Sequence, residues 1–484
     1  MQYFDPFMQY RTPLQNCRIV ITICSMKSEG SQIKITMTIV LITSFITPFM
    51  SNAVSLAIPG IGVEFGATQG MLNWIVSSFL ISTAASLLPF GSLADRYGRK
   101  KVFFFGMILL AASSLGCALA PSIFVLIGFR VVQGLASAMM LGTSIAILTS
   151  VIPPETRGRA LGINAAVTYI GLTCGPVIGG FISNALNWRA LFYLNALMAV
   201  AVLVLTAWKL RGEWRGDVAK MDAWGIVLCI FAQGFLLFGL TDLTAGLLYQ
   251  ICFVLGIILL LVFFFYERKS PNPLIPVESI MKNRTFVFSN IATLFNYCAT
   301  FAITFILSLY LQVVMGMNPS VSGLILLIQP IIMAALSPVT GTLSDRVAPA
   351  FLAAIGIGLS AVGLFLFSLL TVDTPVVFII LNQAFIGVGY AMFSSPNTNA
   401  VMSSVDGALY GVASSIIGNM RVLGQSISIA VVSLITSVLI QNLALGSPEY
   451  TDKFMISLKI SFIVFAVMCA FGVWASLAGK RRRL

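Results

Sequence analysis

Long apolar runs dominate the chain, and short polar segments separate each run from the next. A helix needs about 20 consecutive apolar residues to cross the hydrocarbon core of a bilayer. Fourteen segments meet this requirement, so the pattern predicts fourteen membrane-spanning helices. They cover residues 35–58, 70–92, 100–119, 122–149, 158–184, 190–208, 222–241, 246–266, 286–312, 320–342, 348–370, 374–402, 408–440 and 457–478.

The composition supports a membrane protein and excludes a soluble one. Of the 484 residues, 58% are apolar and 9% are charged, whereas soluble chains contain about 45–50% apolar and about 25% charged residues. The sequence has no histidine, and its eight cysteines are scattered without a CxxC spacing. We therefore expect no metal, no cofactor and no enzymatic activity.

The basic residues predict the orientation of the chain. The net charge is +12, but the charges lie in short clusters between apolar runs, which does not indicate a nucleic-acid surface. With both termini in the cytoplasm, most of the 28 lysines and arginines lie inside, while Arg189, Lys453 and Lys459 lie outside. This asymmetry follows the positive-inside rule. We expect a multi-pass protein of the plasma membrane with both termini cytoplasmic.

An internal repeat divides the chain into two halves. The string Gly91-Ser-Leu-Ala-Asp-Arg96 recurs 250 residues later as Gly341-Thr-Leu-Ser-Asp-Arg346. At an offset of 249, Gly158-Arg-Ala-Leu-Gly162 is matched with Gly407-Ala-Leu-Tyr-Gly411, and Gly175 with Gly424. Two similar bundles that face each other are the arrangement of many alternating-access carriers.

The repeat predicts an all-α membrane fold with two six-helix bundles and two extra helices. The bundles are expected at residues 34–210 and 271–479, and residues 211–270 carry the two inserted helices. Residues 1–33 are expected to form a cytoplasmic tail of mixed, irregular character, and residues 480–484 a basic cytoplasmic tail.

The loop after the second span carries an ordered string from Gly91 to Lys101. Gly91 and Gly98 permit close packing and a turn, and Asp95 can accept hydrogen bonds from the N-terminus of a neighbouring helix. The string resembles the loop 2–3 signature of the major facilitator superfamily. The resemblance implies that this loop clamps one half against the other during transport. A basic loop that only fixes orientation is the alternative.

Two arginines, Arg130 and Arg421, lie within predicted spans. An arginine at the bilayer centre costs about 2.5–3.5 kcal/mol even on insertion scales, so it must face water, a partner or a substrate. Arg130 and Gln133 share one helix face, and their string resembles the RxxQG motif of the superfamily, which is linked to proton coupling. The alternative for both arginines is a structural role, bonded to carbonyls of neighbouring helices.

The fifth span resembles the GxxxGPxxGG motif of the superfamily's exporters. Its glycines permit close approach of another helix, and its proline bends the span. A seal or pivot is implied, and generic helix packing is the alternative. The residues concerned are Gly171, Gly175, Pro176, Gly179 and Gly180.

Three further strings resemble the fourteen-span drug:proton antiporter branch, which performs multidrug efflux and confers drug resistance. They are Asn187-Trp-Arg189 with Phe192 and Asn195, Leu309 to Gly316, and Met221 to Gly225. The resemblance runs from about residue 36 to residue 478.

One position departs from this branch. Met50 stands where the branch has a carboxylate in span 1. We expect no acid deep in a span, because Glu64, Asp242, Asp373 and Asp406 lie at or beyond helix ends. Arg130 stays charged, so it can pair or gate but cannot readily carry a proton.

Neutral polar and aromatic residues are the candidates for lining the substrate cavity. The alternative for each of them is a structural role, in which the side chain forms a hydrogen bond between two helices. They are Asn52, Asn73, Ser77, Gln133, Tyr169, Asn290, Thr293, Tyr297, Gln329, Asn382, Gln383 and Tyr390.

The leading hypothesis is a monomeric secondary active transporter that exports small amphipathic or toxic compounds by proton antiport. The alternative is an exporter of a metabolite or organic anion, with a different coupling ion or none. A membrane-bound sensor or enzyme is disfavoured, because the loops are short and no cluster of acids, cysteines or histidines suits catalysis.

Overall fold

The computed structural model describes residues 13–67, 69–215, 222–241, 243, 246–440 and 448–479. Within these ranges the regular elements are all helices. Fourteen stretches of the described chain are long and apolar enough to cross a membrane. The predicted fourteen-span fold is confirmed.

The first six spans are one helix each. They are α1 (Pro13–Phe65), α2 (Gln69–Tyr97), α3 (Arg99–Ala118), α4 (Ile123–Val151), α5 (Arg157–Ala185) and α6 (Trp188–Lys209), with the short helix η1 (Pro154–Thr156) before α5. The inserted hairpin consists of α7 (Ala223–Thr241) and α8 (Leu247–Lys269), and the short helix α9 (Val277–Lys282) follows.

The last six spans contain more breaks. Span 9 consists of α10 (Arg284–Thr300), α11 (Ala302–Leu309) and a π-helical turn, η2 (Tyr310–Val314), and span 10 of α12 (Pro319–Leu326) and α13 (Ile328–Ser344). The others are α14 (Pro349–Phe367), α15 (Val376–Ser403), α16 (Tyr410–Leu439) after η3 (Gly407–Leu409), and α17 (Pro448–Ala478).

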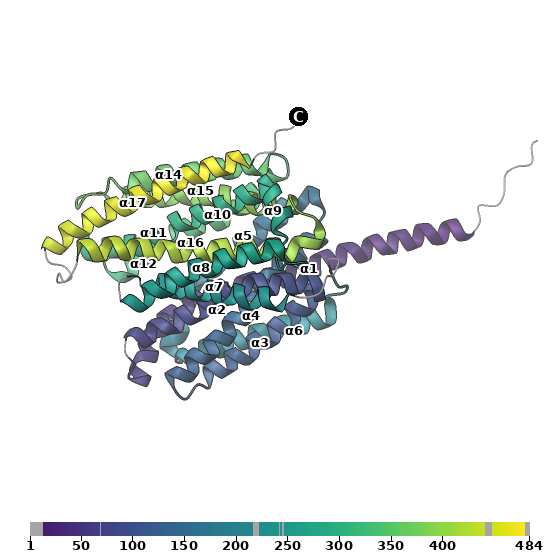
Figure 1. Cartoon of the computed structure of the whole chain (residues 1–484), viewed down its shortest axis with the longest axis horizontal. Coiled ribbons are helices and arrows are strands. Elements are labelled where there is room, and N and C mark those ends of the chain that lie inside the picture. The colour runs from purple at the N-terminus through teal and green to yellow at the C-terminus, as the bar shows by residue number, and fades with distance from the viewer. Residues whose placement is uncertain are drawn as a thin grey trace, which may run out of the picture.

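The N-terminal segment adds a helix before the first span. Residues 13–33 are helical and continue into that span, and their place in a cytoplasmic tail stays a prediction. Figure 1 shows α1 projecting from the bundle as a single long helix. A helix that emerges from a bilayer continues where its sequence has no strong breaker, and no glycine or proline lies between Leu14 and Glu29.

The helices form two groups that meet along a seam. In Figure 1, α2, α3, α4 and α6 lie on one side and α10, α14, α15 and α17 on the other. Across the seam, α5 packs on α13 and α2 packs on α16. The repeat relates these two contacts, because α2 corresponds to α13 and α5 to α16.

The contacts correct the register of the repeat. Gly341 packs against Gly158, whereas Gly91 packs against Gly411. Gly411 is therefore the counterpart of Gly158, and the predicted match of Gly158 with Gly407 is one helical turn off. Glycines that recur every four residues match in several registers one turn apart, so the strings alone could not decide between them. The helices η1 and η3 agree with the new register, since each directly precedes the helix concerned.

The inserted hairpin lies along the seam. Helix α7 packs against α8, and also against α2 and α16. The Asn419 side chain on α16 donates hydrogen bonds to the Ala84 carbonyl on α2 at 3.0 Å and to the Gln233 side chain on α7 at 2.5 Å. One amide thus joins the hairpin and both bundles.

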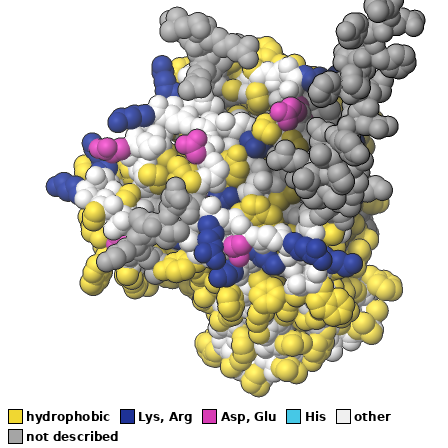
Figure 2. Space-filling model, turned by 90° about the vertical axis from the view of Figure 1, so that its right-hand side faces the viewer, with side chains coloured by type: hydrophobic (Ala, Val, Ile, Leu, Met, Phe, Trp, Pro, Cys, Tyr) yellow, Lys and Arg dark blue, Asp and Glu magenta, His cyan; other side chains and the backbone are white. Residues whose placement is uncertain are grey.

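Basic side chains gather at one end of the molecule. Figure 2 looks onto the end from which α1 projects, and Lys and Arg are spread across that face. The α2–α3, α4–α5 and α13–α14 connections lie at the same end, because the spans alternate in direction. We call it the basic end.

At the opposite end an ion pair closes α1 onto α6. The Arg189 guanidinium lies 2.5 Å from the Glu64 carboxylate, and the Trp188 indole donates to the same carboxylate at 2.7 Å. The hydrogen bond from Arg189 lowers the pKa of Glu64, so this exposed acid stays ionised at neutral pH.

The glycines of the fifth span pack directly on α1. A Cβ at Gly175 would lie 2.8 Å from the Phe49 carbonyl oxygen, and one at Gly179 would lie 2.5 Å from the Ala53 Cβ. Both distances are too short for a side chain, so glycine is required for this helix contact.

We therefore expect Gly179→Leu to force α1 away from α5. Overpacking of this kind costs about 1–3 kcal/mol, which should lower the thermal unfolding midpoint of the purified protein. The matched control is Gly128→Leu on α4, where an added Cβ meets no atom within 4 Å. Equal midpoints for the two variants would contradict the packing argument.

Candidate functional site

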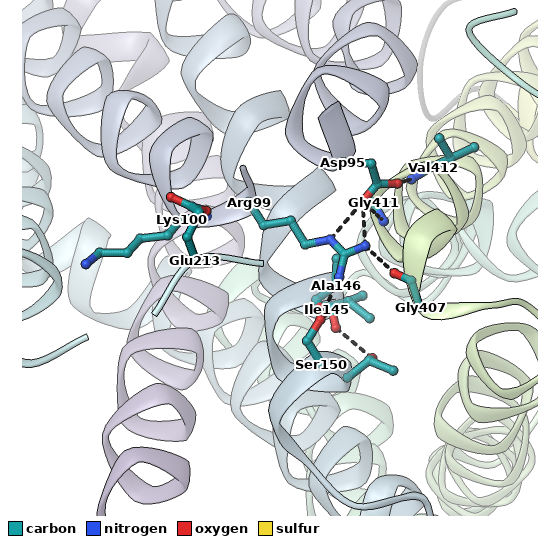
Figure 3. Close-up of polar contacts among 11 residues, drawn as sticks. Asp95, Arg99, Lys100, Ile145, Ala146, Ser150, Glu213, Gly407, Gly411 and Val412 are labelled. Carbon is teal, nitrogen blue, oxygen red and sulfur yellow. Dashed lines mark hydrogen bonds and ion pairs between the residues drawn. The ribbon is translucent and has the colours of Figure 1, made fainter. Parts of the chain in front are cut away.

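A buried carboxylate joins the two bundles at the basic end. Asp95, near the end of α2, is 5% exposed. Its two oxygens each accept a 2.9 Å hydrogen bond, from the backbone N–H of Gly411 and of Val412 (Figure 3). These donors are the free amides at the start of α16, where the helix dipole favours a negative charge.

Arg99 completes this contact. Its Nε donates to Asp95 at 2.7 Å, its Nη1 to Ser150 at 2.6 Å and its Nη2 to the Gly407 carbonyl at 2.5 Å. The charge is therefore neutralised and tied to α4 and to the turn before α16. We call the Asp95–Arg99 pair with the α16 N-terminus the first clamp (Figure 3).

Two glycines allow the clamp to form. A Cβ at Gly91 would lie 2.6 Å from the Gly411 carbonyl and would also clash with Ser415, so α2 and α16 touch at their backbones. Gly98 has a φ of +117°, a conformation that favours glycine, and it turns the chain from α2 into α3. Beside it, the Lys100 ammonium group donates to the Leu210 carbonyl, and the Lys100 backbone N–H donates to the Glu213 carboxylate.

The repeat forms a second clamp with the same geometry. The Asp345 carboxylate accepts hydrogen bonds from the N–H groups of Gly158, at 2.6 Å, and Arg159, at 2.9 Å, at the start of α5. The sequence has Pro349 where the first string has Arg99. The second clamp therefore has the carboxylate and helix N-terminus but not the arginine. Arg346, next to Asp345, is exposed.

Sequence reasoning missed a buried acid beside the first clamp. Glu267, in the last turn of α8, is 2% exposed, and it accepts a 2.9 Å hydrogen bond from the Ile275 N–H. Gly225 leaves room for its other oxygen, which has no hydrogen-bond partner among the described residues. Arg96 donates to the Pro273 carbonyl at 2.7 Å in the same segment. Glu267 begins a polar Glu-Arg-Lys run, which reads in sequence as an ordinary helix end.

Arg130 is enclosed within the N-terminal bundle. Its Nε donates to the Ile75 carbonyl at 2.9 Å and its Nη1 to Gln133 at 2.6 Å, and its guanidinium lies 4.3 Å from the centre of the Phe79 ring. Gln133 in turn donates to Ser114 at 2.9 Å. These contacts agree with the structural alternative for Arg130.

Met50 lies beside this arginine. A small cavity of about 10 Å³, room for roughly one water molecule, has Met50, Thr47, Arg130, Gln133 and Asn195 among its lining residues. In the drug:proton antiporter branch that the sequence resembles, this position is an acid. Here it is Met50, whose thioether side chain faces Arg130. Glu64 lies in the last turn of α1, and Asp373 and Asp406 lie between helices, as expected; Asp242 lies outside the described residues.

A different group of candidates meets on the seam. Tyr169 of α5 contacts Tyr390 of α15 with ring centres 6.0 Å apart, and Tyr390 contacts Tyr297 of α10 at 5.5 Å. Arg421 of α16 places its guanidinium 5.6 Å from the Tyr297 ring and donates to Thr398 at 3.0 Å. These residues come from both bundles.

The other cavity candidates are dispersed. Asn52 donates to the Leu172 carbonyl, Asn290 to that of Phe286 and Asn382 to that of Gly363, and each amide serves its own bundle. Five candidates remain: Thr293 accepts from Asn397, Gln329 and Gln383 are buried, Ser77 is half-buried and Asn73 is exposed.

We expect Asp95→Asn to open the first clamp. Removing one partner of a buried ion pair costs about 3–5 kcal/mol. Ser415 is fully buried against Gly91, and its hydroxyl has no hydrogen-bond partner among the described residues. Ser415→Cys therefore breaks no hydrogen bond and introduces a thiol that reports the opening of this contact. Asp95→Asn should raise the rate of maleimide labelling at Ser415→Cys, located by mass spectrometry, by at least about tenfold.

Two further variants sharpen this test. Asp345→Asn should raise the labelling rate less, because no arginine is left unpaired, and Asp373→Asn, at the opposite end, should leave the rate unchanged. Identical labelling in the Asp95→Asn and parent proteins would show that the first clamp does not hold this end closed.

Comparisons with known proteins agree with this architecture. The chain is 26% identical to the riboflavin transporter RibZ of Clostridioides difficile (strain 630), over 90% of this chain and 96% of that protein. It is 30% identical to the multidrug resistance protein Stp of Mycobacterium tuberculosis (strain CDC 1551 / Oshkosh), over 78% of this chain and 71% of that protein.

The fold is also found in a solved structure. The human organic anion transporter MFSD10 (TETRAN) matches with a TM-score of 0.67 at 12% identity, over 92% of this chain and 99% of that chain. The sequence model of the Major Facilitator Superfamily matches residues 40–429, and this multi-pass transporter belongs to that superfamily.

Proposed function

We propose that this protein is a secondary active exporter of small amphipathic compounds that works by alternating access between its two bundles. The observation that carries the proposal is the pair of clamps at the basic end, each formed by a carboxylate of one bundle and a helix N-terminus of the other. Such contacts can break and re-form as the bundles rock.

The proposal assigns the basic end to the cytoplasm, because basic loops remain on that side. The described conformation is then closed toward the cytoplasm. The protein acts as a monomer in the plasma membrane with both termini cytoplasmic. Names of relatives support a small-molecule substrate, since Stp is called a multidrug resistance protein and RibZ a riboflavin transporter.

We further propose that proton antiport drives export. The proton-coupling group cannot be the residue in span 1 that serves as the acid in the drug:proton antiporter branch, because that residue is Met50 here and cannot ionise. Arg130 holds its charge through hydrogen bonds to a carbonyl and an amide. Buried acids lie instead at the basic end, at Asp95 and Glu267, where the clamps must open on each cycle.

Transport into inverted vesicles tests both parts. With the vesicle interior acidified, we expect the wild-type protein to accumulate amphipathic dyes, and a protonophore to abolish accumulation. Asp95→Asn should reduce the rate strongly, because the cycle can no longer close the first clamp. Dye uptake that ignores the gradient would refute proton antiport, and failure to move any of a cationic, a neutral and an anionic dye would refute the export function.

A further inference from the structure

We propose that Arg421 and the tyrosines Tyr169, Tyr297 and Tyr390 form a binding site for planar aromatic anions on the seam between the bundles. The inference rests on the proposed export function, because it names the class of compound that the exporter would carry. It assigns recognition to Arg421 and not to Arg130.

The depth of the cluster suits a substrate site. On α5, Tyr169 lies eleven residues beyond Gly158, which the second clamp holds, and on α16 Arg421 lies ten residues beyond Gly411, which the first clamp holds. At 1.5 Å per residue both lie about 15–17 Å from the clamps, near the midplane of a hydrocarbon core about 30 Å thick.

Arg130 lies at a different depth. The first clamp contacts α4 at Ser150, twenty residues from Arg130, which is about 30 Å along the helix. A substrate held between the bundles at the midplane therefore meets Arg421 and not Arg130.

Arg421 has unused hydrogen-bonding capacity. A guanidinium carries five N–H donors, yet the described hydrogen bond of Arg421 is the one from Nη2 to Thr398. Its Nε is enclosed and has no hydrogen-bond partner among the described residues. A desolvated cation that lacks partners is costly in a membrane, so the site favours an incoming acceptor.

The charge balance around Arg421 favours an anion. In the part of the chain that the structure describes, the ion pairs are Asp95–Arg99, Glu64–Arg189 and Glu449–Lys453, all near the ends of the spans. No carboxylate in these pairs neutralises Arg421. A carboxylate matches the planar fork of a guanidinium with two parallel hydrogen bonds. A phenolate oxygen also accepts from the guanidinium, whereas a cationic compound would be repelled.

The tyrosines supply the aromatic part of the site. Tyr390 lies almost perpendicular to Tyr169 and Tyr297, with angles of 80° and 79° between the ring planes. Tyr169 belongs to one bundle and the other two tyrosines belong to the opposite bundle. When the bundles separate, Tyr169 leaves Tyr390 and frees a ring face on which a planar aromatic compound can stack.

The experiment compares two dyes with the same ring system and opposite charge. Fluorescein is anionic at mildly alkaline pH, and rhodamine 123 is a cation on the same xanthene scaffold. Binding of each dye to the purified full-length protein in lipid nanodiscs is measured by fluorescence anisotropy. We expect the wild-type protein to bind fluorescein more tightly than rhodamine 123.

Arg421→Gln should weaken fluorescein binding about tenfold or more, which corresponds to about 1.4 kcal/mol, and leave rhodamine 123 binding unchanged or tighter. Arg421→Lys should lie between the two, because it keeps the charge and loses the fork. Retained rhodamine binding shows that Arg421→Gln is folded, and Arg421→Lys serves as the test if Arg421→Gln is not.

Two tyrosine variants separate stacking from charge. Tyr390→Leu should weaken both dyes to a similar extent. Tyr310→Phe is the control, because Tyr310 is also buried but donates to the Thr371 carbonyl away from the seam cluster. It should change the binding of neither dye.

The proposal is overturned if the wild-type protein binds rhodamine 123 and not fluorescein, or if Arg421→Gln changes both affinities equally or neither. Vesicle uptake of the same dyes separates this result from the export function. Arg421-dependent binding without uptake would refute export and keep the site, whereas uptake of the cationic dye alone would keep export and refute the anion site.

Discussion

A charge in the hydrocarbon core must be paired or hydrogen-bonded, and this constraint decides where the charged side chains of the protein lie. Asp95 is buried because Arg99 and the two amides of α16 neutralise it. Arg130 is buried because a carbonyl, an amide and an aromatic ring surround it. Glu64, Asp373 and Asp406 lie at the ends of helices, where water reaches them. Arg421 satisfies the constraint least, because its Nε has no hydrogen-bond partner among the described residues, and it lies where the two bundles meet.

In the proposed cycle, the same constraint would allow the closed end to open reversibly. Each clamp uses a carboxylate and backbone amides that lie near a membrane surface, so water can replace the lost hydrogen bonds when the contact opens. At and beside the clamps, contacts such as Gly91 with Gly411 and Gly162 with Gly341 bring backbones together without interlocking large side chains. Such surfaces can part and meet again without repacking of a core.

Sequence patterns predicted those features that depend on nearest neighbours along the chain. The fourteen spans follow from apolar length, whereas the string around Asp95 indicated a helix N-terminus as its partner but could not identify that helix as α16. The predicted register of the repeat was wrong by one helical turn. Glycines that recur every fourth residue fit either register, and only the contact of Gly158 with Gly341 decides between them. The seam cluster could not be assembled in advance, because Tyr169, Tyr297, Tyr390 and Arg421 come from four helices. Glu267 was missed because burial at a helix end depends on the segment that folds over it.

The inserted hairpin contacts the two helices that the proposed movement would separate. Gly239 packs on Phe253 and Gly256 on Leu236, so α7 and α8 interlock and behave as one unit. That unit is bonded to α16 through Gln233 and Asn419, while Asn419 also reaches Ala84 on α2. If α2 and α16 separate, Asn419 cannot keep both partners, because its amide spans the seam. In the proposed cycle the hairpin would therefore travel with one bundle and slide against the other. The Arg96 contact to Pro273 links the segment after the hairpin to the clamp loop.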